Sequence, residues 1–150
     1  MVQCQARPDI LWVQHHNGIF WSGNGARTWQ EVTGAQPSNF GFAVGVHPKD
    51  SGIAWFAPAV SDQCRVPVDG KVSVTRTLDG GKTFECLTSG LPQANAFDLV
   101  YRHGLDVDAT GEILAIGSTT GGLWISENMG DSWTCVSAHF PPIYAVRFLN

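Results

Sequence analysis

Apolar residues recur along the chain in short runs that are separated by turns rich in Gly, Pro, Asn and Asp. The runs are rich in β-branched and aromatic side chains, which favour strands. They include residues 10–14, 42–46, 53–57, 113–117 and 123–126. A spacing of about ten residues between such runs is typical of β-sandwiches, barrels and propellers. We therefore expect an all-β fold with no helix longer than a turn or two.

Internal similarity distinguishes among these architectures. Three octapeptides, at 22–29, 77–84 and 126–133, share the pattern Ser/Thr-x-Asp/Asn-x-Gly/Ala-x-Ser/Thr-aromatic. They recur at intervals of about 50 residues, slightly above the roughly 40–45 residues of a common propeller repeat. An inserted loop at 61–70 accounts for the excess. The repeat favours a β-propeller.

The octapeptides resemble Asp-boxes, the hairpin turns of bacterial neuraminidase (BNR) repeats, sortilin-type receptors, xyloglucanases and photosystem II assembly factors. The whole chain also resembles the C-terminal part of bacterial BNR-repeat proteins that are often labelled glycosyl hydrolase or exo-alpha-sialidase. Residues 11–20, 101–108 and 141–148 carry that likeness. The resemblance implies sialidase-like or sortilin-like propeller blades of four antiparallel strands, with each Asp-box between the third and fourth strands.

On this basis residues 1–150 form a single partial β-propeller domain of about three blades. Residues 42–88 and 98–137 make two blades. Residues 10–33 supply three strands of another blade, and 143–149 complete it by pairing with 10–14. Because propellers have about four to eight blades, the chain is either part of a larger ring or half of an oligomeric one. A homo-oligomer or further blades are therefore expected partners.

The octapeptides have a structural explanation. Their third residue accepts N–H groups of its own turn, and their final aromatic packs between sheets. The structural Asp-box residues are Asn24, Trp29, Asp79, Phe84, Asn128 and Trp133. Calcium binding by the acidic positions is the alternative. In the first octapeptide Ala26 replaces the usual Gly, which predicts a strained turn.

Composition excludes several classes of function. A net charge of -4 without a basic run is unlike that of a nucleic-acid-binding protein. The apolar run 53–60 contains Pro58 and is far shorter than the roughly 20 residues of a membrane span. The N-terminus lacks the apolar stretch of a secretory signal, so we expect a cytoplasmic protein. The four cysteines form no C-x-x-C pair, so we expect free, mostly buried thiols and neither a metal nor another cofactor.

Blade topology predicts that unusual polar residues gather in loops on one face, around the central opening. The candidate ligand-binding residues are His15, His16, Asp62, Arg65, Arg102 and His103. Neighbouring residues in a strand point to opposite sides, so only one of the two histidines would reach a ligand. The alternative is a hydrogen-bonding role at a blade rim. Arg102 could hold a carboxylate or phosphate, or instead contact Asp98 or Asp106.

These residues favour a non-catalytic binding or scaffold module for a protein or carbohydrate ligand that the sequence does not name. The alternative is a fragment of a glycoside hydrolase, sialidase-like or xyloglucanase-like, whose other catalytic residues lie in missing blades. A glycosidase needs two carboxylates or a Tyr nucleophile, and Asp62, Asp69, Asp98 and Asp106 are the available acids. No arginine triad can be assigned, so no catalytic residue is proposed and this chain is not expected to be an enzyme.

Overall fold

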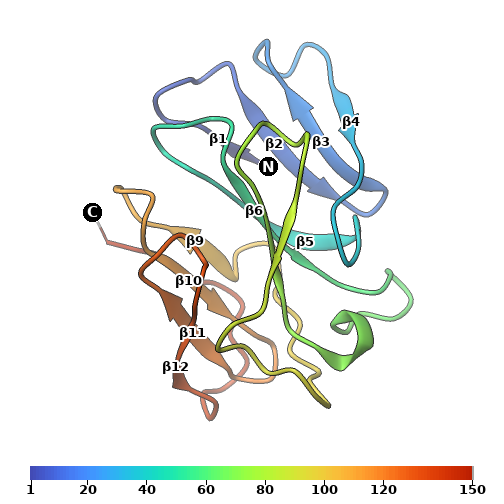
Figure 1. Ribbon diagram of the computed structural model, residues 1–150, viewed down its shortest axis with the longest axis vertical. Coiled ribbons are helices and arrows are strands. Elements are labelled where there is room, and N and C mark those ends of the chain that lie inside the picture. The colour runs from blue at the N-terminus through green and yellow to red at the C-terminus, as the bar shows by residue number, and fades with distance from the viewer. Residues whose placement is uncertain (150) are drawn as a thin grey trace.

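The computed structural model describes residues 1–149. These residues form three four-stranded antiparallel sheets, each built from consecutive strands (Figure 1). The one helical element in this range is a short 3-10 turn, Val68–Gly70, inside the inserted loop. The predicted all-β fold and its four-stranded blades are confirmed.

The strands follow the predicted order. The first sheet contains β1 (Val2–Gln3), β2 (Leu11–His15), β3 (Gly18–Ser22) and β4 (Gln30–Val32). The second contains β5 (Gly41–Val46), β6 (Ala54–Pro58), β7 (Val74–Thr77) and β8 (Glu85–Leu87). The third contains β9 (Leu105–Val107), β10 (Leu114–Gly117), β11 (Leu123–Ser126) and β12 (Thr134–Ser137). Each octapeptide lies between the third and fourth strands of its sheet.

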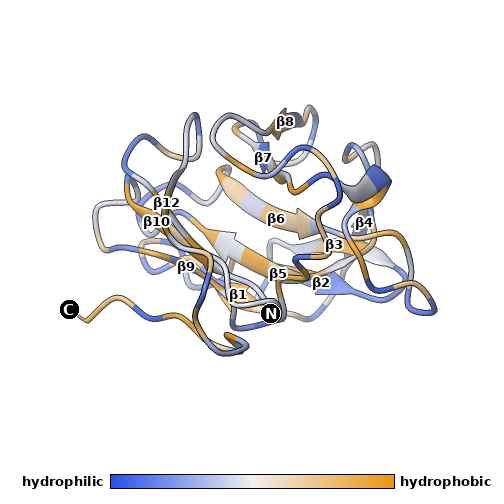
Figure 2. Ribbon diagram, turned by 90° about the horizontal axis from the view of Figure 1, so that it is seen from below, coloured by the Kyte–Doolittle hydropathy of each residue, from blue (hydrophilic) through white to orange (hydrophobic). Residues whose placement is uncertain are grey.

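Two large hydrophobic cores join the sheets, and a third, smaller cluster surrounds Phe42. Trp12 and Ile19 of the first sheet pack with Phe56 of the second. On the other side of the second sheet, Trp55 packs with Leu114 and the other apolar residues of the third. A strand covered on both faces needs an unbroken apolar run instead of alternation. This explains why β5 is buried at every residue and why apolar colour runs along β5 and β6 in Figure 2.

The first sheet takes its innermost strand from a segment that sequence analysis left out. Val2 and Gln3 pair with Trp12 and Leu11, so this edge of β2 is already occupied within the chain. Residues 143–149 instead run beside the third sheet. Ala145 forms a single parallel bridge with His103, and the Val146 N–H donates to the His103 carbonyl at 2.8 Å. The predicted pairing of 143–149 with 10–14 is therefore not formed within the chain, and pairing between chains stays a prediction.

A second difference concerns the start of the third sheet. A four-stranded blade at 98–137 places its first strand at 98–107, but β9 begins only at Leu105. The Gly104 N–H donates to the Tyr101 carbonyl at 2.7 Å, which closes a turn over Arg102 and His103. These two residues therefore lie in a turn that leads into the innermost strand, and not in the strand itself.

Two further features are independent of the sheet order. No helix in the part of the chain that the structure describes is long and apolar enough to cross a membrane. All four cysteines are free, but only Cys4 is buried, so the prediction of mostly buried thiols is wrong. Cys86 and Cys135 lie on fourth strands, which are the outer strands of their sheets and are largely solvent-exposed.

Candidate functional site

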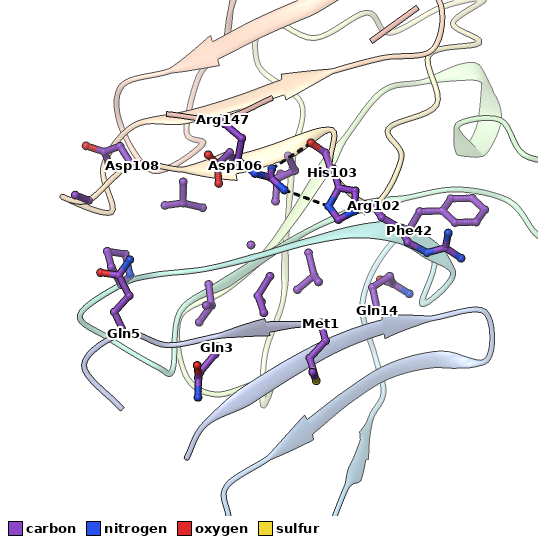
Figure 3. A pocket seen from close by; sticks show the side chains of 18 residues that line it. Met1, Gln3, Gln5, Gln14, Phe42, Arg102, His103, Asp106, Asp108 and Arg147 are labelled. Carbon is purple, nitrogen blue, oxygen red and sulfur yellow. Dashed lines mark hydrogen bonds between the residues drawn. The ribbon is translucent and has the colours of Figure 1, made fainter. Parts of the chain in front are cut away.

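The innermost strands converge on a cavity of about 400 Å³, here called the central pocket (Figure 3). One wall carries the amides of Gln3, Gln5 and Gln14 from the first sheet. The opposite wall carries charged residues from the turn before β9, from β9 itself and from the C-terminal segment. They are Arg102, His103, Asp106, Asp108 and Arg147. The Nε2 groups of Gln3 and Gln14 already donate to main-chain carbonyls of the chain, so this wall offers a ligand chiefly the Gln5 amide. The opposite wall offers charges.

Hydrogen bonds fix part of the charged wall. The Arg147 guanidinium donates to the carbonyls of Val146 and His103 and lies 3.1 Å from Nδ1 of His103. The Asp106 carboxylate accepts the Phe148 N–H at 2.8 Å. Arg102 is exposed and makes no ion pair with any residue in 1–149. Its guanidinium is thus available to a ligand.

A row of aromatic rings, here called the aromatic cluster, lies next to this pocket. The cluster consists of His15, His16, Phe40, Phe42, Tyr101 and Tyr144, whose successive ring centroids are 5.3–6.1 Å apart. Phe42 also lines the central pocket, so the two parts are continuous. Tyr144 stacks on Tyr101 at an interplanar angle of 25° and keeps 62% of its surface exposed. Aromatic faces of this kind bind flat apolar groups while their polar edges stay hydrated.

The inserted loop covers one side of the aromatic cluster. Arg65 lies over the Phe42 ring, with its guanidinium carbon 5.4 Å from the ring centroid. Asp62 holds Arg65 by a hydrogen-bonded ion pair at 2.6 Å and lies 3.9 Å from Nδ1 of His16. Hydrogen bonds with Tyr101 and Asp62 raise the pKa of Arg65 above its ordinary value. The loop therefore places a fixed positive charge beside the rings.

The structure divides the six predicted ligand-binding residues between two adjoining places. His15 and His16 belong to the aromatic cluster, and Asp62 and Arg65 lie against it. Arg102 and His103 line the central pocket. The sequence interpretation missed the rings themselves, Phe40, Phe42, Tyr101 and Tyr144. No local pattern marks these rings, because they come from segments far apart in the sequence that only the folded chain brings together.

Two further carboxylates, those of Asp98 and Asp108, are engaged locally. Asp98 accepts hydrogen bonds from Ser118 and Thr120, which closes the loop at 117–122. Asp69 lies in the 3-10 turn with a φ of 55°. Asp108 accepts hydrogen bonds in its own turn from Thr110 and from two main-chain N–H groups. Burial opposes ionisation there, but these bonds hold the pKa of Asp108 below its ordinary value.

The octapeptide turns share one hydrogen-bond pattern. The side-chain oxygen of the third residue accepts the N–H of the seventh at 2.9–3.0 Å in all three turns. Asn24, Asp79 and Asn128 thus satisfy main-chain donors within their turns. Hydrogen bonds from the Thr83 N–H and hydroxyl lower the pKa of Asp79 to about 2. No three His, Cys, Asp or Glu side chains gather closely enough to hold a metal ion anywhere in residues 1–149.

The final aromatic residues of the octapeptides differ in their surroundings. Trp133 is buried in the core between the second and third sheets, and Phe84 packs against the core between the first and second. Trp29 stands at the open end of the array and keeps 38% of its surface exposed. Within residues 1–149 no sheet packs on this side of the first one, which accounts for the exposure of Trp29.

Comparison with solved structures places these three sheets in a known fold. The chain resembles a GH74 xyloglucanase from Xanthomonas campestris with a TM-score of 0.67 and 26% sequence identity, over 93% of this chain and 20% of that one. It also resembles YCF48 from Cyanidioschyzon merolae with a TM-score of 0.60 and 15% identity, over 93% of this chain and 39% of that one. A structure described as YCF48 bound to D1 peptide has a TM-score of 0.59 and 13% identity, over 95% of this chain and 45% of that one.

These proteins are β-propellers, so the three sheets are blades of a partial β-propeller. The chain spans between a fifth and under a half of the length of these structures. No protein-family model matches the sequence. Neither does any curated protein.

Proposed function

We propose that the chain is a non-catalytic binding module whose loop face holds a segment of a partner protein. The observation that supports this most is the aromatic cluster, which ends in the exposed Tyr144 and continues through Phe42 into the central pocket. Aromatic side chains with few rotatable bonds bury large areas at low entropic cost, and Arg adds directional hydrogen bonds. The repeats would be Asp-box repeats of the BNR type, which serve as the folding framework beneath this face.

The mixture of groups fits a peptide. The exposed Tyr144 ring and the half-buried Tyr101 ring can receive apolar side chains, while the Gln5 amide can bond to a main chain at the pocket. The similar YCF48 structure is described as bound to a peptide, which supports the same class of ligand here. The cytoplasm is the proposed compartment, in keeping with three exposed free thiols.

Selection of peptides from a random displayed library against the immobilised chain tests this function. We expect enriched peptides whose dissociation constant rises at least tenfold in Tyr144→Ala, because the exposed stacking surface is lost. Phe97→Ala is the matched control, since Phe97 is also an exposed aromatic residue but contacts none of the cluster's rings. Peptides that bind both variants equally would contradict the proposed site.

The second candidate is a fragment of a glycoside hydrolase, which the 26% identity to a xyloglucanase favours. This candidate requires turnover that disappears when a general acid or nucleophile is removed. Incubation of the chain with xyloglucan, and assay of new reducing ends, distinguishes the two. Turnover that is lost in Asp62→Asn or Asp69→Asn would replace the binding proposal with the hydrolase, whereas we expect none.

A further inference from the structure

The same contact recurs at both joints between blades. Val32 of β4 lies against Gly81, and Leu87 of β8 lies against Gly130. Each glycine is the fifth residue of the octapeptide turn in the following blade, and each aliphatic side chain comes three residues after an octapeptide's final aromatic. A blade therefore meets the next one by placing an aliphatic side chain on a glycine.

In the third blade the same aliphatic position meets no following blade within residues 1–149. Val136 comes three residues after Trp133, as Val32 follows Trp29 and Leu87 follows Phe84. It is 51% exposed. Beside it lies a groove of about 330 Å³ on the outer strands of the third sheet. The groove is lined by Ile125, Glu127, Asn128, Ser132, Thr134 and Val136. This surface, here called the end face, continues the geometry of the two internal joints.

The first blade of a second copy does not match the end face. Its turn has the same geometry as the others, since the fifth residue's N–H donates to the first residue's hydroxyl at 3.0 Å in the first turn and 2.8 Å in the other two. Its fifth residue, however, is Ala26. A Cβ at Gly81 would lie 2.6 Å from Val32, and one at Gly130 would lie 2.9 Å from Leu87. Such separations are well inside van der Waals contact.

The charges also disfavour a joint between two copies of this chain. At the second joint Arg76 reaches across to Asp131, the sixth residue of the next octapeptide turn, at 2.8 Å. In a joint between two copies the corresponding residues would be Ile125 and Arg27. That joint would gain no ion pair and would bring a charge against an apolar side chain.

We propose that the end face around Val136 binds the octapeptide turn of a propeller blade that has glycine at its fifth position, and that Ala26 excludes a second copy of this chain from that place. The inference rests on the two internal joints and is independent of the ligand bound at the loop face. It makes Ala26 a specificity-determining residue of the blade-to-blade interface.

The full chain carrying Ala26→Gly supplies a probe with the required glycine. Sedimentation velocity over a range of concentrations measures association of the wild-type chain, of this variant and of Ala26→Gly with Val136→Lys. We expect Ala26→Gly to self-associate with a dissociation constant at least tenfold below that of the wild-type chain. Val136→Lys should return the double variant to the wild-type value, because the charge is placed on the exposed aliphatic position. Ala109→Gly, in an exposed turn, is the control for a glycine introduced elsewhere.

Three outcomes would overturn the proposal. The first is a wild-type chain that associates as tightly as Ala26→Gly, which would mean that Ala26 excludes nothing. The second is an Ala26→Gly variant that associates no more tightly than Ala109→Gly. The third is an association of Ala26→Gly that Val136→Lys leaves unchanged, which would assign it to a different surface. Circular dichroism of each variant establishes that the sheets are intact in every comparison.

Discussion

At the scale of single residues, Ala26 is the clearest deviation within the repeat. Its φ is 66°, which is positive like the φ values of 86° and 96° at the equivalent Gly81 and Gly130. This left-handed conformation costs a residue with a Cβ roughly 1–2 kcal/mol. The prediction from sequence that this turn is strained thus has a structural basis in the dihedral angle.

Replacing Ala26 by Gly should therefore stabilise the monomer. We expect a gain of about 0.5–1 kcal/mol, because relief of the left-handed strain exceeds the extra entropy of Gly in the unfolded chain. Urea unfolding of dilute protein measures the change. Ala109→Gly, at a residue without positive φ, should lose stability. A less stable Ala26→Gly would show that the turn carries no strain.

Asp79 should make stability depend on pH. Its pKa falls from 3.8 to about 2 on folding, chiefly through hydrogen bonds from Thr83, so the folded state favours the ionised form. The stabilising contribution is then present above pH 3.8 and is lost as pH falls toward 2. Unfolding curves between pH 2 and pH 5 measure this dependence.

Asp79→Asn is the matched variant, because the other two octapeptides carry Asn24 and Asn128 in the same geometry. It should fold normally and lose this part of the acid sensitivity. Equal acid sensitivity in both proteins would assign the effect to other carboxylates.

At the scale of elements, Arg76 connects the second and third sheets. It is 8% exposed, pairs with Glu85 of its own blade and with Asp131 of the next, and donates to the Met129 carbonyl. Such charge-assisted hydrogen bonds from a buried group are worth more than exposed ion pairs.

Arg76→Met should destabilise the chain by about 1–3 kcal/mol, since the apolar stem is kept and three polar partners are lost. Its two carboxylate partners are more than half exposed and can be rehydrated, which limits the cost. Thermal unfolding gives the value. Arg65→Met removes an exposed pair on the inserted loop and should leave the melting temperature almost unchanged.

Strand periodicity and the repeat predicted eleven of the twelve strands, because each has apolar or β-branched residues or follows an octapeptide, although β9 begins at Leu105 and not at residue 98. The exception is β1, whose two residues carry too little pattern to be recognised, although pairing with Leu11 and Trp12 makes them a strand. Residues 143–149 show the reverse. They were expected to close the first sheet as a strand, but within residues 1–149 they form a single β-bridge, at Ala145, beside a few separate hydrogen bonds.

At the scale of the whole molecule, the sequence indicates several polar residues of the loop face but not the rings that lie between them. Polar residues such as Asp62 and Arg65 were identified because they are unusual in a loop. The rings that they cover, Phe42 and Tyr101, looked like ordinary core residues, and only the folded chain brings them beside Tyr144 from three distant segments. Contacts of this kind depend on tertiary packing and leave no local pattern.

The cysteines report on the integrity of the fold. Cys64, Cys86 and Cys135 are exposed, while Cys4 is fully buried where the first sheet meets the second, with its thiol directed at the carbonyls of His47 and Pro48. A thiol reagent should modify three cysteines at once and the fourth only as slowly as this joint opens. Rapid modification of all four in native protein would mean that the first sheet is not held against the second.

The second sheet is covered by a hydrophobic core on each face, and the first and third sheets by one each. In energetic terms the middle blade contributes to both interfaces, whereas each outer blade contributes to one, as in a short linear array with nearest-neighbour coupling. Loss of an outer blade therefore removes one interface, while loss of the middle blade removes both. Partial unfolding should begin at either end, and amide hydrogen exchange should be slowest in β6 and β7.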